Sequence, residues 1–99
     1  MRDEIKFLAE MVGKASNCEQ VYLFGSEARG DAHEGSDVDL ALIIPDGVSP
    51  RQALRAAIRA TAQRSHPIDL VVIAHSNWAS GQSLLARQIR QEGILLYGQ

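Results

Sequence analysis

The chain has 99 residues and a mass of 10.8 kDa, which accommodates one compact domain and excludes a second hydrophobic core. Hydrophobic residues make up 45% and charged residues 22%, and no apolar run approaches the roughly 20 residues that cross a bilayer. Charges interrupt the apolar positions of the first eleven residues, which excludes a secretory signal, and the single Cys18 excludes an internal disulfide. We therefore expect one domain, residues 1–99, in a reduced, cytoplasmic protein without membrane contact.

The net charge of −2 conceals an asymmetry between the two halves of the chain. Residues 1–49 carry ten acidic and four basic side chains, whereas residues 50–99 carry six arginines and two acids. Proteins that bind nucleic acid have an excess of positive charge, so direct nucleic-acid binding is not expected. An acidic half is consistent with carboxylates gathered around a metal ion. The small size leaves little protein for recognising a substrate.

The first half of the chain is predicted to form a helix and two strands. Apolar residues at helical spacing predict an amphipathic helix over residues 2–14, with Gly13 and the Ser16–Asn17 pair as its stop signals. A short β-rich run predicts a strand over residues 21–24. Residues 37–44 alternate as a second strand, with Val38, Leu40, Leu42 and Ile44 on one face and Asp37, Asp39, Ala41 and Ile43 on the other.

A second helix is predicted after a turn at residues 45–47. Ser49 supplies a hydroxyl cap and Pro50 occupies the first helical position, so the helix is expected to run to about Arg64. The helical spacing predicts that it buries Leu54, Ala57, Ile58 and Thr61. Its exposed stripe is either a solvated face or a docking surface for an acidic partner, and consists of Arg51, Arg55 and Arg59.

The last part of the chain is predicted to contain two strands and one helix. Residues 68–74 form an apolar run typical of a strand buried on both faces, with Asp69 as the exception. A helix is expected over residues 79–92, ended by Gly93, and a terminal strand over residues 94–97. This order predicts an α/β fold, a small mixed β-sheet with helices packed against it.

Asp37 and Asp39 are separated by one residue in the second predicted strand. Residues two apart on a strand face the same side, so the two carboxylates converge. Two such charges repel, and neither ionises readily unless a cation lies between them. Mg²⁺ prefers hard oxygen ligands and takes one or two carboxylates, with water and substrate phosphates completing its shell. The alternative is an exposed strand edge that carries two acids.

Asp69 is an ionisable residue within a predicted apolar strand, where a charge is costly to bury without a partner. One interpretation is a strand position close to solvent. The other is that this strand lies beside that of Asp37 and Asp39 and delivers a third carboxylate to one site. Three acids from neighbouring strands could form a two-metal phosphoryl-transfer centre, in which one ion activates the attacking oxygen and the other holds the triphosphate.

Gly25 and Ser26 follow the first predicted strand and open a polar segment. A glycine lets a phosphate approach the backbone, and a serine hydroxyl with the N–H groups of a helix start can bind phosphate oxygens. Arg29 lies about one helical turn beyond Ser26 and could add a cation. By itself, however, such a turn is often structural only, and the segment matches no Walker sequence.

Together these elements resemble a known signature. Gly25–Ser26, ten further residues and Asp37-x-Asp39 are similar to the signature of the polymerase-β-type nucleotidyltransferase superfamily. The segment GSEARGDAHEGSDVDLALII resembles its minimal nucleotidyltransferase (MNT) branch, in which Gly-Ser-x-Ala-Arg-Gly and Ser-Asp-x-Asp-Leu recur. The strand of Asp69 falls where the family has its third carboxylate, and the closing EGILLYG resembles the family's final strand. The resemblance therefore covers nearly the whole chain.

The resemblance implies a single-domain nucleotidyltransferase fold, a minimal nucleotidyltransferase domain over residues 1–99. Gly25 and Ser26 would bind the nucleotide phosphates, with Arg29 as an additional cation. ATP would be the substrate and Mg²⁺ the cofactor, with two ions expected. The implied catalytic and metal-binding residues are Asp37, Asp39 and Asp69. Glu27 departs from the neutral or basic residue that the family often has there, which places a negative charge near the phosphates.

Proteins of this branch typically form prokaryotic toxin–antitoxin pairs with a HEPN-domain RNase. The resemblance implies an antitoxin of a HEPN/MNT system, acting as a Mg-dependent protein adenylyltransferase in a hetero-oligomer with the cognate toxin. It would neutralise the toxin by transferring AMP from ATP to a tyrosine. The alternatives are an antitoxin that acts by binding alone, with a vestigial site, and a nucleotidyltransferase for a small molecule such as an aminoglycoside. The presence of every expected catalytic residue argues against the first, and the lack of an acceptor domain against the second.

Several remaining side chains carry no motif. Trp78, in a polar stretch, is expected to be half-buried cover for the core, with an interface anchor as the alternative. The histidines His33, His66 and His75 are scattered and are expected at the surface. Cys18 is expected to be a small apolar filler.

Overall fold

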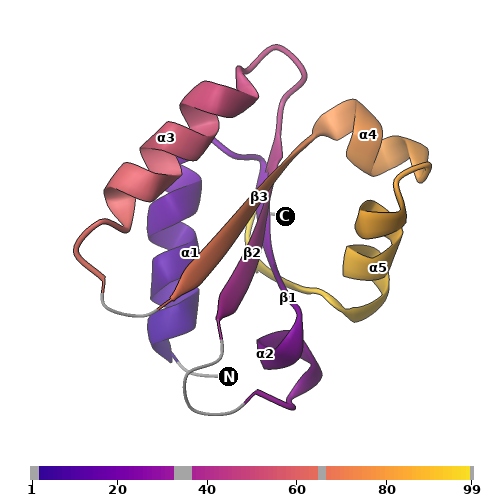
Figure 1. Cartoon of the computed structure of the whole chain (residues 1–99). Helices are drawn as coiled ribbons and strands as arrows, with labels where there is room; N and C mark the ends of the chain where they lie inside the picture. Colours follow the sequence, from indigo (N-terminus) through magenta and orange to yellow (C-terminus); the bar gives the residue numbers. More distant parts are fainter. Residues whose placement is uncertain (1–2, 33–36, 65–66, 99) are drawn as a thin grey trace.

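The computed structural model of the chain describes residues 3–32, 37–64 and 67–98, and Figure 1 shows their arrangement. Four strands form one mixed sheet: β1 (Gln20–Phe24), β2 (Val38–Ile44), β3 (Ile68–Ala74) and β4 (Ile94–Tyr97). Their order across the sheet is β3-β2-β1-β4. The β2 and β3 strands run parallel, whereas β1 is antiparallel to both of its neighbours. The predicted α/β class with a small mixed sheet is therefore confirmed.

The described residues also form five helices: α1 (Asp3–Ser16), α2 (Ser26–Arg29), α3 (Pro50–Ala60), α4 (His75–Ser80) and α5 (Leu84–Glu92). In Figure 1, α1 and α3 lie against each other on one side of the sheet, and α4 and α5 lie on the other. The short α2 helix follows β1 at the lower end of the sheet. None of the helices in these ranges combines the length and the apolar character needed to cross a bilayer.

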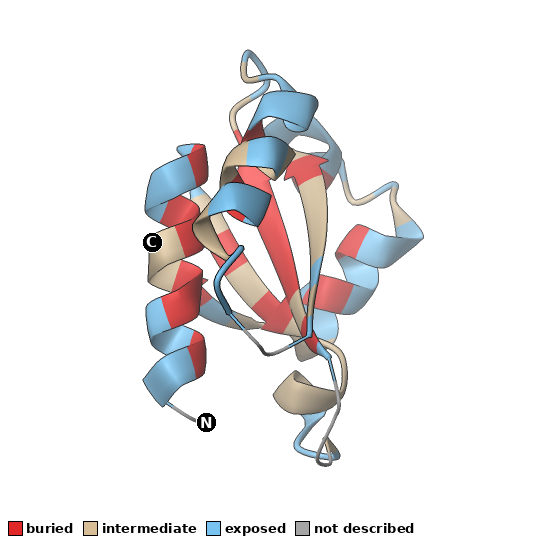
Figure 2. Ribbon diagram, turned by 60° about the vertical axis from the view of Figure 1, so that its left-hand side comes forward, coloured by how far each residue is buried: buried red, intermediate tan, exposed pale blue. Residues whose placement is uncertain are grey.

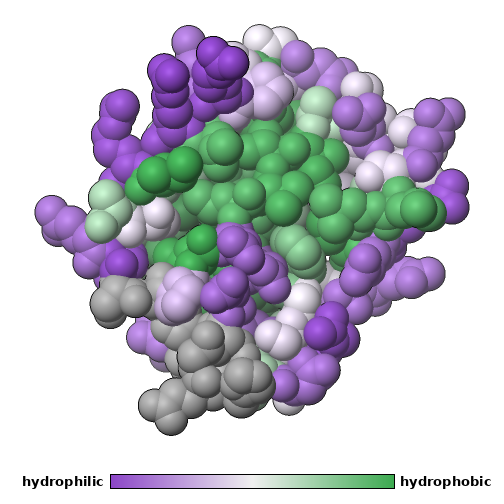
Figure 3. All heavy atoms as spheres, in the orientation of Figure 1, coloured by the Kyte–Doolittle hydropathy of each residue, from purple (hydrophilic) through white to green (hydrophobic). Residues whose placement is uncertain are grey.

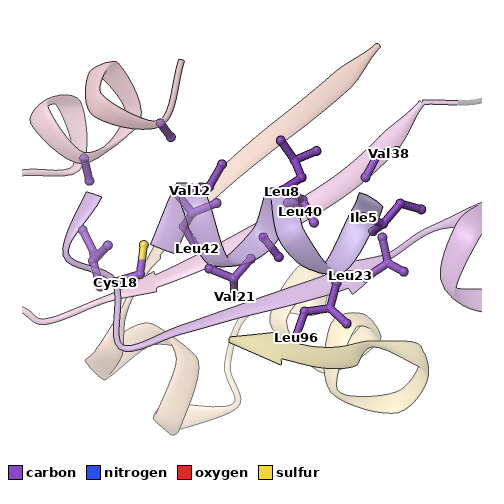
Figure 4. Packing of buried hydrophobic residues seen from close by; sticks show 14 residues of the cluster. Ile5, Leu8, Val12, Cys18, Val21, Leu23, Val38, Leu40, Leu42 and Leu96 are labelled. Atoms are coloured by element: carbon purple, nitrogen blue, oxygen red, sulfur yellow. The ribbon is translucent and has the colours of Figure 1, made fainter. Parts of the chain in front are cut away.

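Side chains that alternate along β2 divide the core into two clusters, as the sequence predicts. The face with Leu40 and Leu42 packs against α1 and α3, and the face with Ala41 and Ile43 packs against α4 and α5. Figure 4 shows the first cluster, in which α1 contributes Ile5, Leu8 and Val12. In Figure 2, β2 is accordingly almost entirely red, because its residues from Leu40 to Ile44 are fully buried. This central strand fixes the register of the whole sheet.

The α1 helix continues past Gly13, the first of its two predicted stop signals, and ends at the second, Ser16–Asn17. Gly13 is buried inside the helix, which runs on to Ser16 and is followed by Asn17 in the left-handed conformation (φ 56°). A Cβ atom at Gly13 would overlap the ring of Tyr97 on β4. The glycine therefore allows close approach of α1 to the sheet rather than stopping the helix.

The α3 helix differs from the prediction at its end and in one buried residue. It ends at Ala60 rather than near Arg64, and the Thr61 hydroxyl donates to the carbonyl oxygens of the preceding turn. Ala57 is buried as predicted, Leu54 and Thr61 are half-buried, and Ile58 is 53% exposed, so its predicted burial is wrong. Small alanines face the sheet in this helix, and Ile58 lies outside the stripe that they form.

Two predictions for the last part of the chain are also corrected. The β3 strand is an edge strand with mostly half-buried residues, because it has a neighbour on one side only, so it is not buried on both faces. The single helix expected over residues 79–92 is two helices. Gly81 ends α4 in the left-handed conformation (φ 71°), and the Ser83 hydroxyl accepts a hydrogen bond from the Ala86 N–H (3.2 Å) at the start of α5.

Trp78 is buried, with 7% of its surface exposed, and belongs to the core as predicted. Its ring lies 4.8 Å from that of Tyr22 on β1. The Arg90 guanidinium lies 4.7 Å from the indole and donates to the Trp78 carbonyl oxygen. These contacts attach α4 and α5 to the sheet and to each other.

Cys18 is buried as an apolar filler, as predicted, and this burial raises the pKa of its thiol. His75 is exposed, as expected, with its Nδ1 2.9 Å from the Glu19 carboxylate. His33 and His66 lie outside the described residues.

We expect Gly13→Ala to lower the free energy of unfolding by about 1–3 kcal/mol, because the new methyl group overlaps the Tyr97 ring in a packed core. This loss outweighs the higher helix propensity of alanine. Chemical denaturation measures the change. The control is Gly47→Ala, because a Cβ at Gly47 meets nothing within 4 Å, and there we expect a change within about 0.5 kcal/mol. Equal losses in the two variants would contradict the packing argument.

Candidate functional site

The residues predicted to form the site meet at one end of the sheet, where β1 ends and β2 and β3 begin. Asp39 is the second residue of β2 and lies directly opposite Asp69, the second residue of the parallel β3. On its other side Asp39 pairs with Phe24, the last residue of β1, which leads into Gly25. The expectation that the Asp69 strand lies beside the Asp37–Asp39 strand is thus confirmed.

Asp39 is the electrostatic centre of this end of the sheet. Its pKa is raised above the ordinary value for an aspartate, chiefly by burial, then by the charges of Asp69 and Asp37, and by a hydrogen bond with the Asp69 side chain. The positive charge of Arg29 acts in the opposite direction. Asp39 is half-buried, whereas Asp37, immediately before β2, and Asp69 are exposed. A carboxylate in these surroundings is stabilised by an added cation.

The donor set of this site fits a hard divalent cation. Asp37, Asp39 and Asp69 offer carboxylate oxygens only, which is the chemistry that Mg²⁺ prefers. Within residues 3–32, 37–64 and 67–98, no three acidic, histidine or cysteine side chains already converge as a metal-binding group. The pair that the fold brings together directly is Asp39 and Asp69, so a site with all three acids requires rotation of their side chains.

Gly25 shapes the turn next to Asp39. Its backbone (φ 76°, ψ −155°) lies in a region that is open essentially to glycine alone. A Cβ atom at Gly25 would overlap Oδ2 of Asp39. The turn continues into α2, in which Arg29 N–H donates to the Gly25 carbonyl (3.1 Å) and Gly30 N–H donates to that of Ser26 (3.0 Å). Gly25 and Ser26 therefore lie against the acidic site, where a phosphate held by this turn would also be close to the carboxylates.

Arg29 is exposed and makes two ion pairs. Its Nε lies 3.2 Å from Asp31, and its Nη1 lies 3.2 Å from Glu92 at the end of α5. These contacts raise the pKa of Arg29, chiefly through Asp31. No sequence pattern predicts the contact between Arg29 and Glu92, because the two residues are 63 positions apart. Arg29 is thus near enough to influence Asp39 while its guanidinium is held by other carboxylates.

The comparison with protein families agrees with this geometry. Residues 6–99 match the family described as Polymerase beta, Nucleotidyltransferase. Because the match covers nearly the whole chain, the chain belongs to the polymerase beta nucleotidyltransferase family.

The chain is similar to protein adenylyltransferase MntA of Shewanella oneidensis, with 28% identity over 94 residues. The matched region covers 95% of this chain and 62% of the length of MntA. It is also similar to a chain in the crystal structure of a toxin–antitoxin with AMP-PNP (TM-score 0.70, 24% identity, 99% of this chain and 75% of that one). A third similarity is to a structure of the tri-AMPylated Shewanella oneidensis HEPN toxin in complex with MNT antitoxin (TM-score 0.67, 20% identity, 100% of this chain and 74% of that one). The similarities to solved structures establish a shared fold.

We predict that Asp39→Asn raises the melting temperature of the metal-free protein at neutral pH by a few degrees. The pKa of Asp39 is higher in the folded protein than in an unfolded chain, so ionisation of this carboxyl costs stability above that pKa. The gain should shrink as the pH falls through the raised pKa, and thermal unfolding across a pH series measures it.

Asp46→Asn is the control of opposite sign. The Ser76 backbone N–H, in the first turn of α4, donates to the Asp46 carboxylate (2.9 Å) and lowers its pKa. This carboxylate therefore stabilises the fold above its unfolded pKa, and its contribution is lost as the pH falls through its lowered pKa. We expect Asp46→Asn to lower the melting temperature slightly at neutral pH. If Asp39→Asn also lowers the melting temperature, this would contradict the claim that ionisation of Asp39 costs stability in the folded protein.

Gly25→Ala is predicted to lower the free energy of unfolding by at least about 3 kcal/mol. Two costs are summed here: the strain of a positive φ in alanine and the overlap of its Cβ with the Asp39 carboxylate. Gly30→Ala is the control: Gly30 also has positive φ (83°), but a Cβ there meets nothing within 4 Å. For this variant we expect a loss of about 1–2 kcal/mol from backbone strain alone. Denaturant titration measures the free energy of unfolding of both variants. Equal losses in the two variants would show that the contact with Asp39 does not contribute to the cost.

Proposed function

We propose that this chain is an antitoxin of the HEPN/MNT kind that acts as a Mg-dependent protein adenylyltransferase, transferring AMP from ATP to a tyrosine of a HEPN-domain toxin. The observation that carries the proposal is the pairing of Asp39 with Asp69 beside the Gly25–Ser26 turn. Membership of the polymerase beta nucleotidyltransferase family supports the reaction class. The similarity to MntA, a protein adenylyltransferase, supports a protein acceptor.

The proposed reaction is an in-line transfer at phosphorus. The tyrosine oxygen attacks the α-phosphorus of ATP, a new P–O bond forms, the bond from the α-phosphorus to the bridging oxygen breaks, and pyrophosphate leaves. Asp69, which is exposed on the edge strand, accepts the proton of the attacking hydroxyl. The Gly25–Ser26 turn orients the phosphate oxygens.

The cation and its ligands complete this proposal. Asp37 and Asp39 would hold Mg²⁺, with Asp69 as a further ligand. When bound, Mg²⁺ would supply the positive charge that attracts the triphosphate and offsets charge on the leaving pyrophosphate. Arg29 supports phosphate binding through its charge, although Asp31 and Glu92 hold its guanidinium.

Transfer of AMP is favoured over neutralisation by binding alone. Binding alone would need none of the three carboxylates, and holding Asp39 half-buried beside Asp69 is costly in the absence of a cation. All three acids are nevertheless present at one end of the sheet, together with the glycine that makes room for Asp39.

The test is to incubate the chain with ATP, Mg²⁺ and the protein encoded by the neighbouring gene, which the proposal requires to be a HEPN-domain protein. We predict a mass increase of the partner by one or more AMP groups, measured by mass spectrometry of the intact protein. The increase should be lost with Asp39→Ala or Asp37→Ala. Asp46→Ala is the matched control, because Asp46 follows the opposite end of β2, and this variant should retain transfer. Equal neutralisation of the toxin by Asp39→Ala without any mass change would favour binding alone.

A further inference from the structure

The outer edge of β3 is open within the described part of the chain. The β3 strand ends the sheet order β3-β2-β1-β4, and no strand of residues 3–32, 37–64 and 67–98 pairs with its other side. It is seven residues long and, apart from Asp69, entirely apolar. A long apolar edge strand with unpaired backbone groups is a template for association with another chain.

The side chains around this edge extend it into an apolar surface. Figure 3 shows this surface crossing β3 from the side of α3 toward the side of α4 and α5, with hydrophilic residues along its border. Its centre consists of half-buried residues of β3, namely Leu70, Val71 and Val72. We call these three residues together with Ile58 of α3 the β3 band.

Ile58 lies on the side of α3 that faces this edge. Ala56 and Ala60 line the groove between α3 and α1. Leu54 and Ile58 are one turn apart and about half a turn around the helix from Ala56, so they lie on the side away from α1. Because α3 packs against both α1 and β3, that side faces the open edge. The 53% exposure of Ile58 is therefore continuous with the exposed part of β3.

A row of positive charge borders the β3 band. Arg51, Arg55 and Arg59 are exposed and recur every four residues along α3. Arg55 lies one turn from Ile58 on the helix surface, whereas Arg59, further around the helix, lines the groove toward α1 with Ala56 and Ala60. Within residues 3–32, 37–64 and 67–98, no carboxylate forms an ion pair with any of the three. Arginine is one of the residues enriched at protein-binding surfaces, where charged side chains surround an apolar centre.

We propose that the β3 band and the arginine row of α3 are the surface on which the acceptor protein docks. The occupant is a segment of that protein with an apolar stripe for the β3 band and acidic side chains for Arg51 and Arg55, the arginines on the side of α3 next to the band. The apolar centre favours a protein over a nucleic acid, whose phosphates would find a charged border but no polar centre. This inference rests on the proposed function, because it assigns the binding surface for the proposed acceptor.

The position of this surface relative to the site supports the assignment. The α3 helix leads into the amino end of β3, so Arg59 is at the end of the row that is nearer to Asp69. Asp69 follows one residue after the start of β3 and is exposed. A partner seated along the open edge of β3 would therefore extend to the carboxylate that accepts the proton of its tyrosine. The opposite edge of the sheet, β4, is separated from Asp69 by β1 and β2.

The test measures the dissociation constant for the purified HEPN-domain protein by calorimetry without ATP, and then the kinetics of AMP transfer. We expect Arg55→Glu and, separately, Ile58→Asp to raise the dissociation constant by about tenfold or more. Transfer should show a raised KM for the protein acceptor and an unchanged kcat at saturation. The control is Lys6→Glu on α1, an exposed charge reversal away from the band, and should change the dissociation constant by less than about twofold. Circular dichroism confirms that the variants are folded.

The outcomes separate this inference from the proposed function. If the partner is modified but both variants bind it like the wild type, the docking surface is wrong and the activity stands. If the wild type binds the partner and the variants bind it more weakly, but no AMP is transferred, the proposed activity is wrong and the docking surface stands. Absence of any binding by the wild type overturns both. Self-association that Ile58→Asp abolishes, with partner binding unchanged, would assign the band to a second copy of the chain and overturn the inference.

Discussion

The half-burial of one carboxylate, Asp39, beside a second, Asp69, on the adjacent parallel strand is the constraint on which this structure depends. Asp39 and Asp69 are brought opposite each other by the register of β2 and β3, and that register cannot slip by one residue without turning the buried side chains of β2 toward the wrong face. Hydrophobic burial along β2 therefore holds together two charges that would otherwise separate. Burial, and then the charges of Asp69 and Asp37, raise the pKa of Asp39, so the ionised form of this carboxyl costs the fold stability.

The neighbouring elements make this arrangement usable. Gly25 leaves room for the Asp39 carboxylate and leads into α2, so the Gly25–Ser26 turn, the phosphate-binding turn of the proposed function, adjoins the acidic residues at one end of the sheet. Arg29 joins this end to α5 through Glu92. The β3 strand has two roles in this account. It carries Asp69, and its outer edge stays open within the described residues, next to the arginines of α3. Family membership and the site then point to the same reaction class.

The sequence predicted the elements whose signals are local. Alternation along residues 37–44 predicted both faces of β2, because a residue pattern of period two is specific for a strand with two different faces. The expectation that the strand of Asp69 lies beside that of Asp39 is confirmed by the pairing of β2 with β3. The features it missed depend on contacts between distant residues. The position of β3 at the sheet edge follows from strand order, and the role of Gly13 follows from Tyr97, 84 positions further along. The division of the last helix into α4 and α5 does have a local signal, namely Gly81 followed by Ser83. The continuous apolar pattern of residues 79–92 predicted one helix in spite of it.

The central claim is that Asp69 and a bound cation act in opposite directions on the ionised form of Asp39. Asp69 raises the free energy of this carboxylate, and a cation lowers it. The most direct test is an NMR pH titration of the Asp39 carboxyl carbon in the wild type, in Asp69→Asn and in the presence of Mg²⁺ with a non-hydrolysable ATP analogue. The account predicts a raised pKa in the free wild type, a pKa closer to the ordinary value in Asp69→Asn, and a clear decrease on binding of Mg²⁺ and nucleotide. An Asp39 that titrates at the ordinary value in all three samples would contradict it.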